Sequence, residues 1–237
     1  MKDPMRRRTF LQSSLIGAGC LLPGIIAAQQ KPAQNEHEQQ NEGEEISPAE
    51  DLMREHGLLN RILLIYDHHL HLLSAKKPFD GSILVNSADI IRHFVEEYHE
   101  KLEEDYLFPR FRKAKKLVSL VETLQIQHKA GRELTAKIRE LAGAASLKYV
   151  SADTDRLADA LRAFLHMYRP HEAREDTVLF PAFRSIVSKH EYAALGEDFE
   201  KKEDQLFGEE GFFKMVDQVA GLEKRLGLYD LAQFTPK

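Results

Sequence analysis

The sequence predicts an all-α protein, an up-down-up-down four-helix bundle followed by additional C-terminal helices. Two observations predict this fold. A segment that begins at His99 recurs 72 positions later at His171 with the shared pattern H-E-x-x-E-[DE]-x-x-L-F-P-x-F-R, and a further histidine precedes each copy by 43 residues, at His56 and His128. At about 1.5 Å per residue, such a spacing accommodates the rest of one helix, a short turn and most of a returning helix. The repeating unit is therefore a pair of helices.

The first 28 residues resemble a twin-arginine export signal. Arg7 and Arg8 precede Thr-Phe-Leu, and an apolar run from Leu15 to Ala28 follows. We therefore expect a bacterial protein that is periplasmic or otherwise exported. Glycines and a proline interrupt the apolar run, which disfavours a membrane anchor, and lipidation of Cys20 is disfavoured because apolar residues continue past it.

The composition is that of an ordinary soluble globular protein, with 43% hydrophobic and 30% charged residues. Cys20 is the single cysteine, so a chain without the signal has none. This excludes disulfides, thiolate metal sites, iron–sulfur clusters and covalently attached haem. The formal charge is −5, and removal of the signal, which carries +3, leaves about −8. We therefore do not expect nucleic acid as a partner.

Residues 29–46 are polar and acidic, and we expect a disordered linker there. The bundle is predicted to span residues 47–188 and to begin with a capping box, in which Ser47 is the N-cap, Pro48 takes the first helical position and Glu50 completes the box. The first helix should extend to about Ala75. Apolar residues and His56 recur along it in steps of three and four, which is typical of a bundle helix.

The second helix is predicted after the turn at residues 76–81, with Ser87 as its N-cap. His99 and Glu103 lie on its inward face. Pro109 should end or kink this helix, because proline lacks a backbone N–H and its ring clashes with the preceding turn.

The third helix follows a basic connection at residues 113–116 and carries His128 in its apolar seam. The fourth is predicted to start near Asp153, with His171 on its inward face. Pro170 lies in the middle of this helix, where the first repeat has Tyr98. We therefore expect a bend or bulge at Pro170 and two halves that are not equivalent.

Residues 189–237 are predicted to form a helical extension, with amphipathic segments at about 191–206 and 212–226. Neither segment has a histidine placed like those of the repeat. Packing against the outside of the bundle, contact with a protein partner and a homodimer contact are the alternatives for its role.

Four histidines and two glutamates fall on the inward faces of the four helices. Residues four apart share a helix face, so His99 can bind a ligand together with Glu103, and His171 together with Glu175. Two hairpins related by a pseudo-twofold axis would bring four imidazoles and two carboxylates together, a donor set that suits iron, manganese or zinc. If both carboxylates bridge two metals, each metal receives two imidazoles and two carboxylate oxygens, and a bridging oxo or hydroxo group adds a fifth ligand. Buried glutamates with no compensating cation are strongly disfavoured.

This pattern resembles the hemerythrin-like, or HHE cation-binding, family over about residues 47–184. The resemblance implies a four-helix bundle that holds a non-haem di-iron centre. Carried over position by position, it also implies the metal ligands, with Glu103 and Glu175 as the bridging pair. These ligands are His56, His99, Glu103, His128, His171 and Glu175.

The sequence departs from the oxygen-carrying members at one position. Those proteins have another histidine four residues after the one on the third helix, where this chain has Arg132. The resemblance is therefore closer to iron-sensing and bacterial members, and Arg132 could hydrogen-bond a bridging carboxylate instead. The remaining histidines of the bundle are expected at the surface or near the site without binding metal. They are His68, His69, His71, His93 and His166.

The ligand set favours binding over catalysis. Ferritin-like oxidative enzymes use four carboxylates and two histidines, and this set inverts that ratio, which disfavours highly oxidised iron. We expect a carrier, store or sensor for dioxygen or a related diatomic or peroxide ligand. The alternatives are a redox enzyme for peroxide or nitric oxide and an iron-handling module. In the enzyme, the candidate proton or electron donors are Tyr66, Tyr98, Tyr106 and Tyr168.

Overall fold

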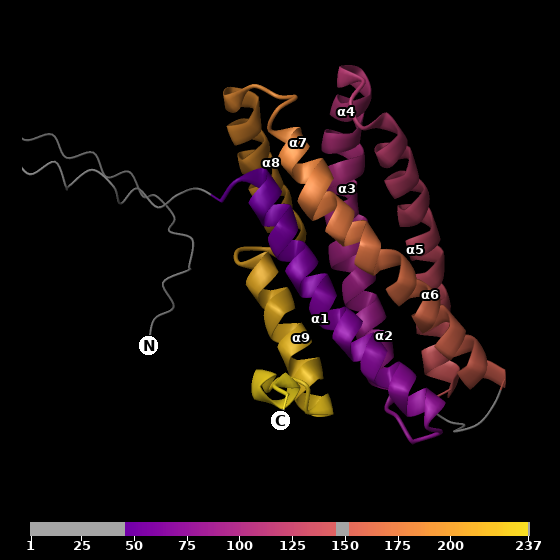
Figure 1. Cartoon of the computed structure of the whole chain (residues 1–237). Coiled ribbons are helices and arrows are strands. Elements are labelled where there is room, and N and C mark those ends of the chain that lie inside the picture. The colour runs from indigo at the N-terminus through magenta and orange to yellow at the C-terminus, as the bar shows by residue number, and fades with distance from the viewer. Residues whose placement is uncertain (1–45, 146–151, 237) are drawn as a thin grey trace, which may run out of the picture. The chain divides into compact units, whose positions relative to one another are not determined.

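The computed structural model describes residues 46–145 and 152–236, and within them the regular secondary structure is entirely helical (Figure 1). The architecture is the predicted one, a bundle of two helix hairpins with further helices after it. The predicted export signal and nearly all of the predicted linker lie outside the described residues. No helix in the described part of the chain is long and apolar enough to cross a membrane.

Each hairpin pairs one continuous helix with one composite rod, in which η1, η2 and η3 are π-helical. The first hairpin consists of α1 (Pro48–Ser74) and of the rod α2 (Gly81–Ile90), η1 (Ile91–His99), α3 (Glu100–Leu102), η2 (Glu103–Leu107) and α4 (Phe108–Ala114). The second hairpin consists of α5 (Val118–Ala145) and of the rod α6 (Ala152–Arg174), η3 (Glu175–Leu179) and α7 (Phe180–Phe183). The chain then forms α8 (Lys189–Phe207), α9 (Gly211–Leu226) and the 3₁₀ turn η4 (Leu231–Phe234). Helix α1 packs beside α6, and α2 beside α5, so the two hairpins interlock.

The start of α1 is the predicted capping box. The Ser47 side chain accepts a hydrogen bond from the Glu50 N–H at 3.3 Å, and the Glu50 carboxylate accepts one from the Ser47 N–H at 3.2 Å. Pro48 occupies the first helical position, where its missing N–H costs nothing. The cap therefore fixes where the bundle begins.

The predicted N-cap of the second helix is wrong. Helix α2 begins at Gly81, because an Asp80 carboxylate oxygen accepts from the Ser82 N–H at 3.0 Å and caps the helix earlier. Ser87 is buried inside α2, and its hydroxyl donates to the carbonyl of Ile83 at 2.8 Å. A mid-helix serine can satisfy its hydroxyl in this way, so its capping preference did not decide the boundary.

Pro109 does not end the rod of the first hairpin, which continues to Ala114. The turn before it is widened, since the N–H of Phe108 donates to the carbonyl of Glu103, five residues back. A regular helix would press the proline ring against the carbonyl four residues back, and the wider turn relieves that clash.

The rod of the second hairpin repeats this arrangement. The N–H of Phe180 donates to the carbonyl of Glu175, directly before Pro181. Both π turns start at a glutamate that is a predicted metal ligand, and π turns are common at functional sites. The Leu-Phe-Pro segments therefore shape the backbone that carries the two carboxylates.

The backbones of the two halves differ at Tyr98 and Pro170, but the irregular segment is not the expected one. Tyr98 belongs to π-helical η1, whereas Pro170 lies inside α6, which remains α-helical. Pro170 is exposed, so water can satisfy the carbonyl that its missing N–H leaves without a partner. The bulge expected at Pro170 is thus replaced by a π-helical segment in the first repeat.

Only Lys115, Lys116 and Leu117 connect the two hairpins. Lys115 and Leu117 adopt left-handed backbone angles, with φ of 53° and 51°, which reverse the chain within this short span. The core then closes between the hairpins, where the rings of Phe111 and Phe183 lie 6.1 Å apart. Their neighbours in sequence are the Leu-Phe-Pro segments, so the core and the wide turns meet at one end of the bundle.

Helices α8 and α9 pack beside the first hairpin, against α1 and α2 (Figure 1). The ring of Phe207 lies 5.4 Å from that of Phe94 and 5.5 Å from that of Tyr98. Glu203 of α8 accepts a hydrogen bond from the N–H of Phe212 at 2.8 Å and so satisfies a free N–H at the start of α9. The extension is therefore part of one packed unit with the bundle.

Candidate metal centre

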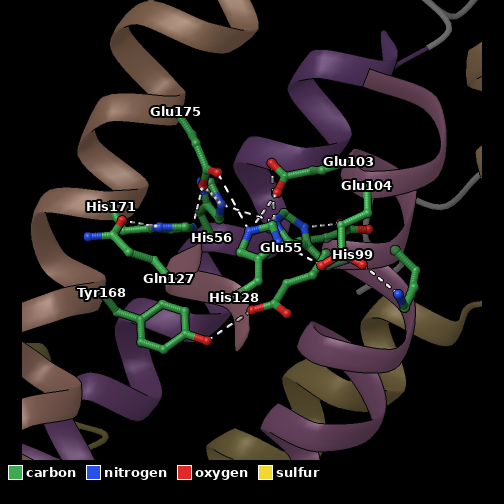
Figure 2. Close-up of polar contacts among 12 residues, drawn as sticks. Glu55, His56, His99, Glu103, Glu104, Gln127, His128, Tyr168, His171 and Glu175 are labelled. Atoms are coloured by element: carbon green, nitrogen blue, oxygen red, sulfur yellow. Dashed lines mark hydrogen bonds and ion pairs between the residues drawn. The ribbon is translucent and has the colours of Figure 1, made fainter. Parts of the chain in front are cut away.

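The six predicted ligands meet in the middle of the bundle. Figure 2 shows Glu103 and Glu175 pointing toward the group of four imidazoles. None of the six side chains is more than 4% exposed. They come from the two continuous helices and the two composite rods of the bundle. The ones that the structure brings together are His56, His99, Glu103, His128, His171 and Glu175.

One pair of imidazoles belongs to each hairpin. In the first, His56 Nε2 and His99 Nε2 are 3.0 Å apart, and the ring centroids are 4.7 Å apart. In the second, the centroids of His128 and His171 are 5.1 Å apart. The two pairs are the halves of a pseudo-symmetric site.

Each carboxylate reaches imidazoles from both hairpins. Glu175 Oε2 lies 3.2 Å from His171 Nε2 and 3.3 Å from His56 Nε2. Glu103 has one oxygen 3.2 Å from His128 Nε2 and the other 3.9 Å from His99 Nε2. This position, between the two imidazole pairs, is the one that a bridging carboxylate requires.

The Nδ1 atoms of the four imidazoles are held by acceptors outside the centre. His56 donates to Asp176 at 2.7 Å, and its counterpart His128 faces Glu104 at 3.1 Å. These contacts direct each Nε2 inward, where it can bind a metal once it has lost its proton.

The other two imidazoles follow the same rule. His99 donates to Glu55 at 2.7 Å, and its counterpart His171 donates to Gln127 at 2.9 Å. Sequence reasoning missed all four partners. The signal was present, since Glu104 and Asp176 are the [DE] position of the repeat and Glu55 and Gln127 directly precede its first histidine.

The donor atoms fit a pair of metal cations. Both oxygens of Glu103 and of Glu175 are buried without a hydrogen-bond partner, as is His128 Nε2, and such atoms are costly unless a cation compensates them. The 3.0 Å between the Nε2 atoms of His56 and His99 requires a shared proton when no cation is bound, and it also matches two ligands at right angles around an ion with bonds of about 2.1 Å. Two triads of nearby donor atoms result. They are His56, His99 and Glu103, and His128, His171 and Glu175.

The pKa values of the centre show what a cation would replace. Burial and the charge of Glu175 raise the pKa of Glu103 to about 6. Burial opposes ionisation of Glu175 too, but the adjacent His171 and His56 hold its pKa well below the usual value. Burial and the neighbouring His56 lower the pKa of His99 to about 4. Protons shared among these groups balance the buried charge, so metal binding must release protons.

Phe108 and Phe180 form apolar walls of the centre. The Phe108 ring stacks on His128 with centroids 5.4 Å apart, and the Phe180 ring stacks on His56 at the same distance. Both phenylalanines contact the ligand rings directly and shield them from water.

Arg132 does not contact a bridging carboxylate. Its Nη2 lies 2.8 Å from Glu100 and 2.7 Å from Glu104, so it acts on the partner of His128 instead. The half-exposed guanidinium is engaged by these two carboxylates, whereas Glu103 is fully buried, so the expected hydrogen bond to a bridging carboxylate does not form.

Among the tyrosines of the described residues, Tyr168 is the one with a ring contact to a ligand. Its ring lies 5.5 Å from that of His171, and its hydroxyl donates to Glu100 at 2.9 Å. Gly131 makes this possible, because a Cβ there would lie 2.0 Å from the Tyr168 hydroxyl. The other tyrosines proposed as donors pack against phenylalanines. Tyr66 packs against Phe164, Tyr98 against Phe94 and Tyr106 against Phe199.

The remaining histidines of the bundle stay outside the centre. His71, His93 and His166 are exposed and His68 is half-buried, as expected. His69 differs, because it is fully buried, donates to the carbonyl of Ile65 at 2.8 Å and packs on Phe79. It is a core histidine rather than a surface one.

Comparisons with known proteins identify a family and related sequences. A family model described as the hemerythrin HHE cation binding domain matches residues 47–183 and again residues 119–230. The two matches start 72 residues apart, which is the repeat period. Uncharacterized protein Rv1995 of Mycobacterium tuberculosis and uncharacterized protein Mb2018 of Mycobacterium bovis are each 43% identical over 232 residues, which cover 97% of this chain and 91% of theirs. No solved structure matches the chain significantly.

Proposed function

The chain belongs to the hemerythrin HHE cation-binding family, and on this basis we propose that it is an exported non-haem di-iron protein that binds a small ligand such as dioxygen. The observation that carries the proposal is the position of Glu103 and Glu175, each of which faces imidazoles of both hairpins. One cation would be held by His56 and His99 and the other by His128 and His171, with the two carboxylates shared between them.

An iron pair would supply redox-active cations with a coordination position left open for a small molecule. If the two carboxylates are shared, each iron has four protein ligands, whereas iron generally accepts about six. The protein orients the imidazoles through their Nδ1 partners and excludes water with Phe108 and Phe180. Two carboxylates against four imidazoles supply little negative charge, which favours reversible binding over deep oxidation.

Export is supported by the twin-arginine pattern at Arg7 and Arg8 and by the apolar run that follows it. That route carries proteins that are already folded, which suits a centre buried in the bundle core. A fusion of residues 1–28 to a reporter protein tests this part. Export should require both arginines, and export of a double lysine variant at the same rate would contradict it.

A redox enzyme is the second candidate, and Tyr168 is the observation that favours it. The hydroxyl of this buried tyrosine is hydrogen-bonded to Glu100, and its ring contacts that of His171. A tyrosine in this position could deliver a proton or an electron during peroxide or nitric oxide chemistry. Turnover of peroxide that falls in Tyr168→Phe would support the enzyme over the binder.

The deciding experiment uses the chain from residue 29 loaded with ferrous iron without air. Oxygen is admitted, and the visible spectrum is recorded before and after degassing. A charge-transfer band that disappears on degassing supports a ligand binder, whereas irreversible conversion to a ferric spectrum supports redox chemistry or iron handling. His171→Ala should abolish the band, and the exposed His166→Ala, on the same helix, is the matched control. Iron well below two per chain would contradict the di-iron assignment.

A further inference from the structure

Two residues at equivalent positions of the repeat carry different charges next to the centre. Glu55 precedes His56, and Gln127 precedes His128 in the second repeat. Each side chain accepts a hydrogen bond from the second histidine of its own hairpin. Glu55 accepts from His99 Nδ1 at 2.7 Å, and Gln127 accepts from His171 Nδ1 at 2.9 Å. The geometry of the hydrogen bond is the same, but one acceptor is a carboxylate and the other is a neutral amide.

The remaining imidazole partners increase this difference. Asp176, the partner of His56, has no other ion pair among the contacts of the described residues. Glu104, the partner of His128, is neutralised by Arg132 at 2.7 Å and by Lys101 at 2.5 Å. The first imidazole pair therefore faces two carboxylates, and the second faces one compensated carboxylate and an amide.

The C-terminal extension adds further negative charge on the same side. Glu203 of α8 lies with Asp51 and Glu55 in a cluster in which one carboxylate oxygen of each residue is within 4.8 Å of the others. All three residues are buried, so water screens their charges poorly, and Arg54, 3.5 Å from Asp51, compensates only part of this charge. A cation at His99 therefore experiences a field from these carboxylates that the equivalent position at His171 lacks.

A carboxylate that accepts from the Nδ1–H of a metal-bound imidazole raises the basicity of the coordinating nitrogen. Loss of such a partner typically weakens metal binding by about 10- to 100-fold. An amide orients the ring equally well but contributes no charge. The two positions are thus equal in ligand type and geometry and unequal in the charge behind the ligands.

We propose that Glu55 and Gln127 make the two metal positions unequal, so that the His56–His99 position binds its cation first and more tightly. The His128–His171 position then fills second and releases its cation more readily. Glu55 is a positioning residue that acts on the metal through His99. This inference rests on the proposed two-metal function and extends it to the order of loading.

The test is calorimetric titration of the metal-free chain with Zn²⁺, which undergoes no redox change, at pH 8.5 and in the presence of a competing chelator. At this pH protons compete little with the metal for the imidazole nitrogens. The wild type should show two steps that differ about 10- to 100-fold in affinity. Glu55→Gln should weaken the tighter step by about that factor, and Gln127→Glu should strengthen the weaker step.

Ligand variants assign each step to a position. His171→Ala should retain the tighter step, and His99→Ala should retain only the weaker one. Circular dichroism identifies variants that do not fold. The swapped double variant Glu55→Gln/Gln127→Glu keeps the total charge constant while it should weaken the first position and strengthen the second.

The possible outcomes separate the two proposals. Two zinc steps of equal affinity, or a Glu55→Gln variant that leaves the tighter step unchanged, would overturn the loading order and leave the di-metal centre intact. Two unequal steps in a protein whose iron form binds no small ligand would overturn the proposed function and support the loading order. A single zinc per chain would overturn both.

Discussion

The two hairpins of the bundle hold the same ligands in different surroundings. The first hairpin, residues 48–114, is covered by α8 and α9 and contains π-helical η1. The second, residues 118–183, is a regular pair of helices up to the wide turn η3. Imidazoles, carboxylates and the phenylalanines on the ligand rings repeat, while several positions around them, such as Glu55 and Gln127, do not. The difference teaches that ligand placement depends on the repeat and that the properties of each metal position depend on non-repeated residues.

The largest effect is expected from substitution of a bridging carboxylate, because each of these carboxylates contacts imidazoles of both hairpins. Glu103→Gln should weaken metal binding in both positions by about 100-fold or more, which removes at least about 2.7 kcal/mol of metal-dependent stability. His99→Ala should weaken mainly its own position. Metal content and thermal unfolding, each with and without a chelator, measure the effect.

In the metal-free protein, Glu103→Gln should change the stability in the opposite direction. Since burial and Glu175 raise the pKa of Glu103 to about 6, its charge is unfavourable above that pH when no cation is bound. Metal-free Glu103→Gln should therefore be more stable than the metal-free wild type at pH 8. A less stable variant would mean that Glu103 has a structural role apart from metal.

Glu96 gives the next largest effect and lies where the second repeat has the neutral Tyr168. Burial and the charge of Glu100 raise its folded-state pKa from 4.5 to about 7. The folded state then binds the proton more tightly, so its contribution to stability is present below pH 4.5 and decreases as the pH rises to 7. Glu96→Gln should be more stable than the wild type by up to about 3 kcal/mol at pH 8.

Denaturant unfolding at pH 5 and pH 8 measures this difference. The gain should nearly vanish at pH 5, where Glu96 is largely protonated in the folded protein. Tyr168→Phe, which changes a neutral residue at the equivalent position, should show no comparable pH dependence. An equal gain from Glu96→Gln at both pH values would exclude its titration as the cause.

A smaller effect on stability is expected at Gly131, where the first repeat has Leu59. A Cβ at Gly131 would lie 2.0 Å from the Tyr168 hydroxyl. Gly131→Ala should therefore cost about 1 to 3 kcal/mol through overpacking. In Tyr168→Phe the clashing oxygen is absent, so the double variant should recover part of the loss in denaturant unfolding. No recovery would mean that the backbone of α5, rather than the tyrosine, limits the space.

The smallest effect is expected at Arg110, which has Ala182 as its repeat counterpart. Its side chain pairs with Glu191 of α8 at 2.9 Å on the surface. Arg110→Ala should cost less than about 1 kcal/mol, because exposed ion pairs contribute little. A larger loss of stability, measured by thermal unfolding, would show that the first hairpin depends on the extension through this contact.

The sequence predicts the bundle, the six converging side chains and the capping box at Ser47, because all of these follow from local periodicity or from the repeat. The cap of α2 was wrong since Asp80 and Ser87 are both good N-caps and propensity alone does not choose between them. The π turns were not predicted because they depend on how each proline ring packs in three dimensions. The partners of the imidazoles are also a tertiary feature, since Asp176 lies 120 residues from His56.

The three-residue connection between the hairpins has an evolutionary consequence. Each hairpin supplies two imidazoles and one carboxylate, so a shorter ancestor made of one hairpin could have built the whole centre by pairing with an identical copy about a twofold axis. The present chain has the form of such a dimer after gene duplication and fusion through Lys115, Lys116 and Leu117. Fusion frees each copy to mutate alone, and two genetically independent halves can then acquire different affinities that a symmetric dimer could never encode.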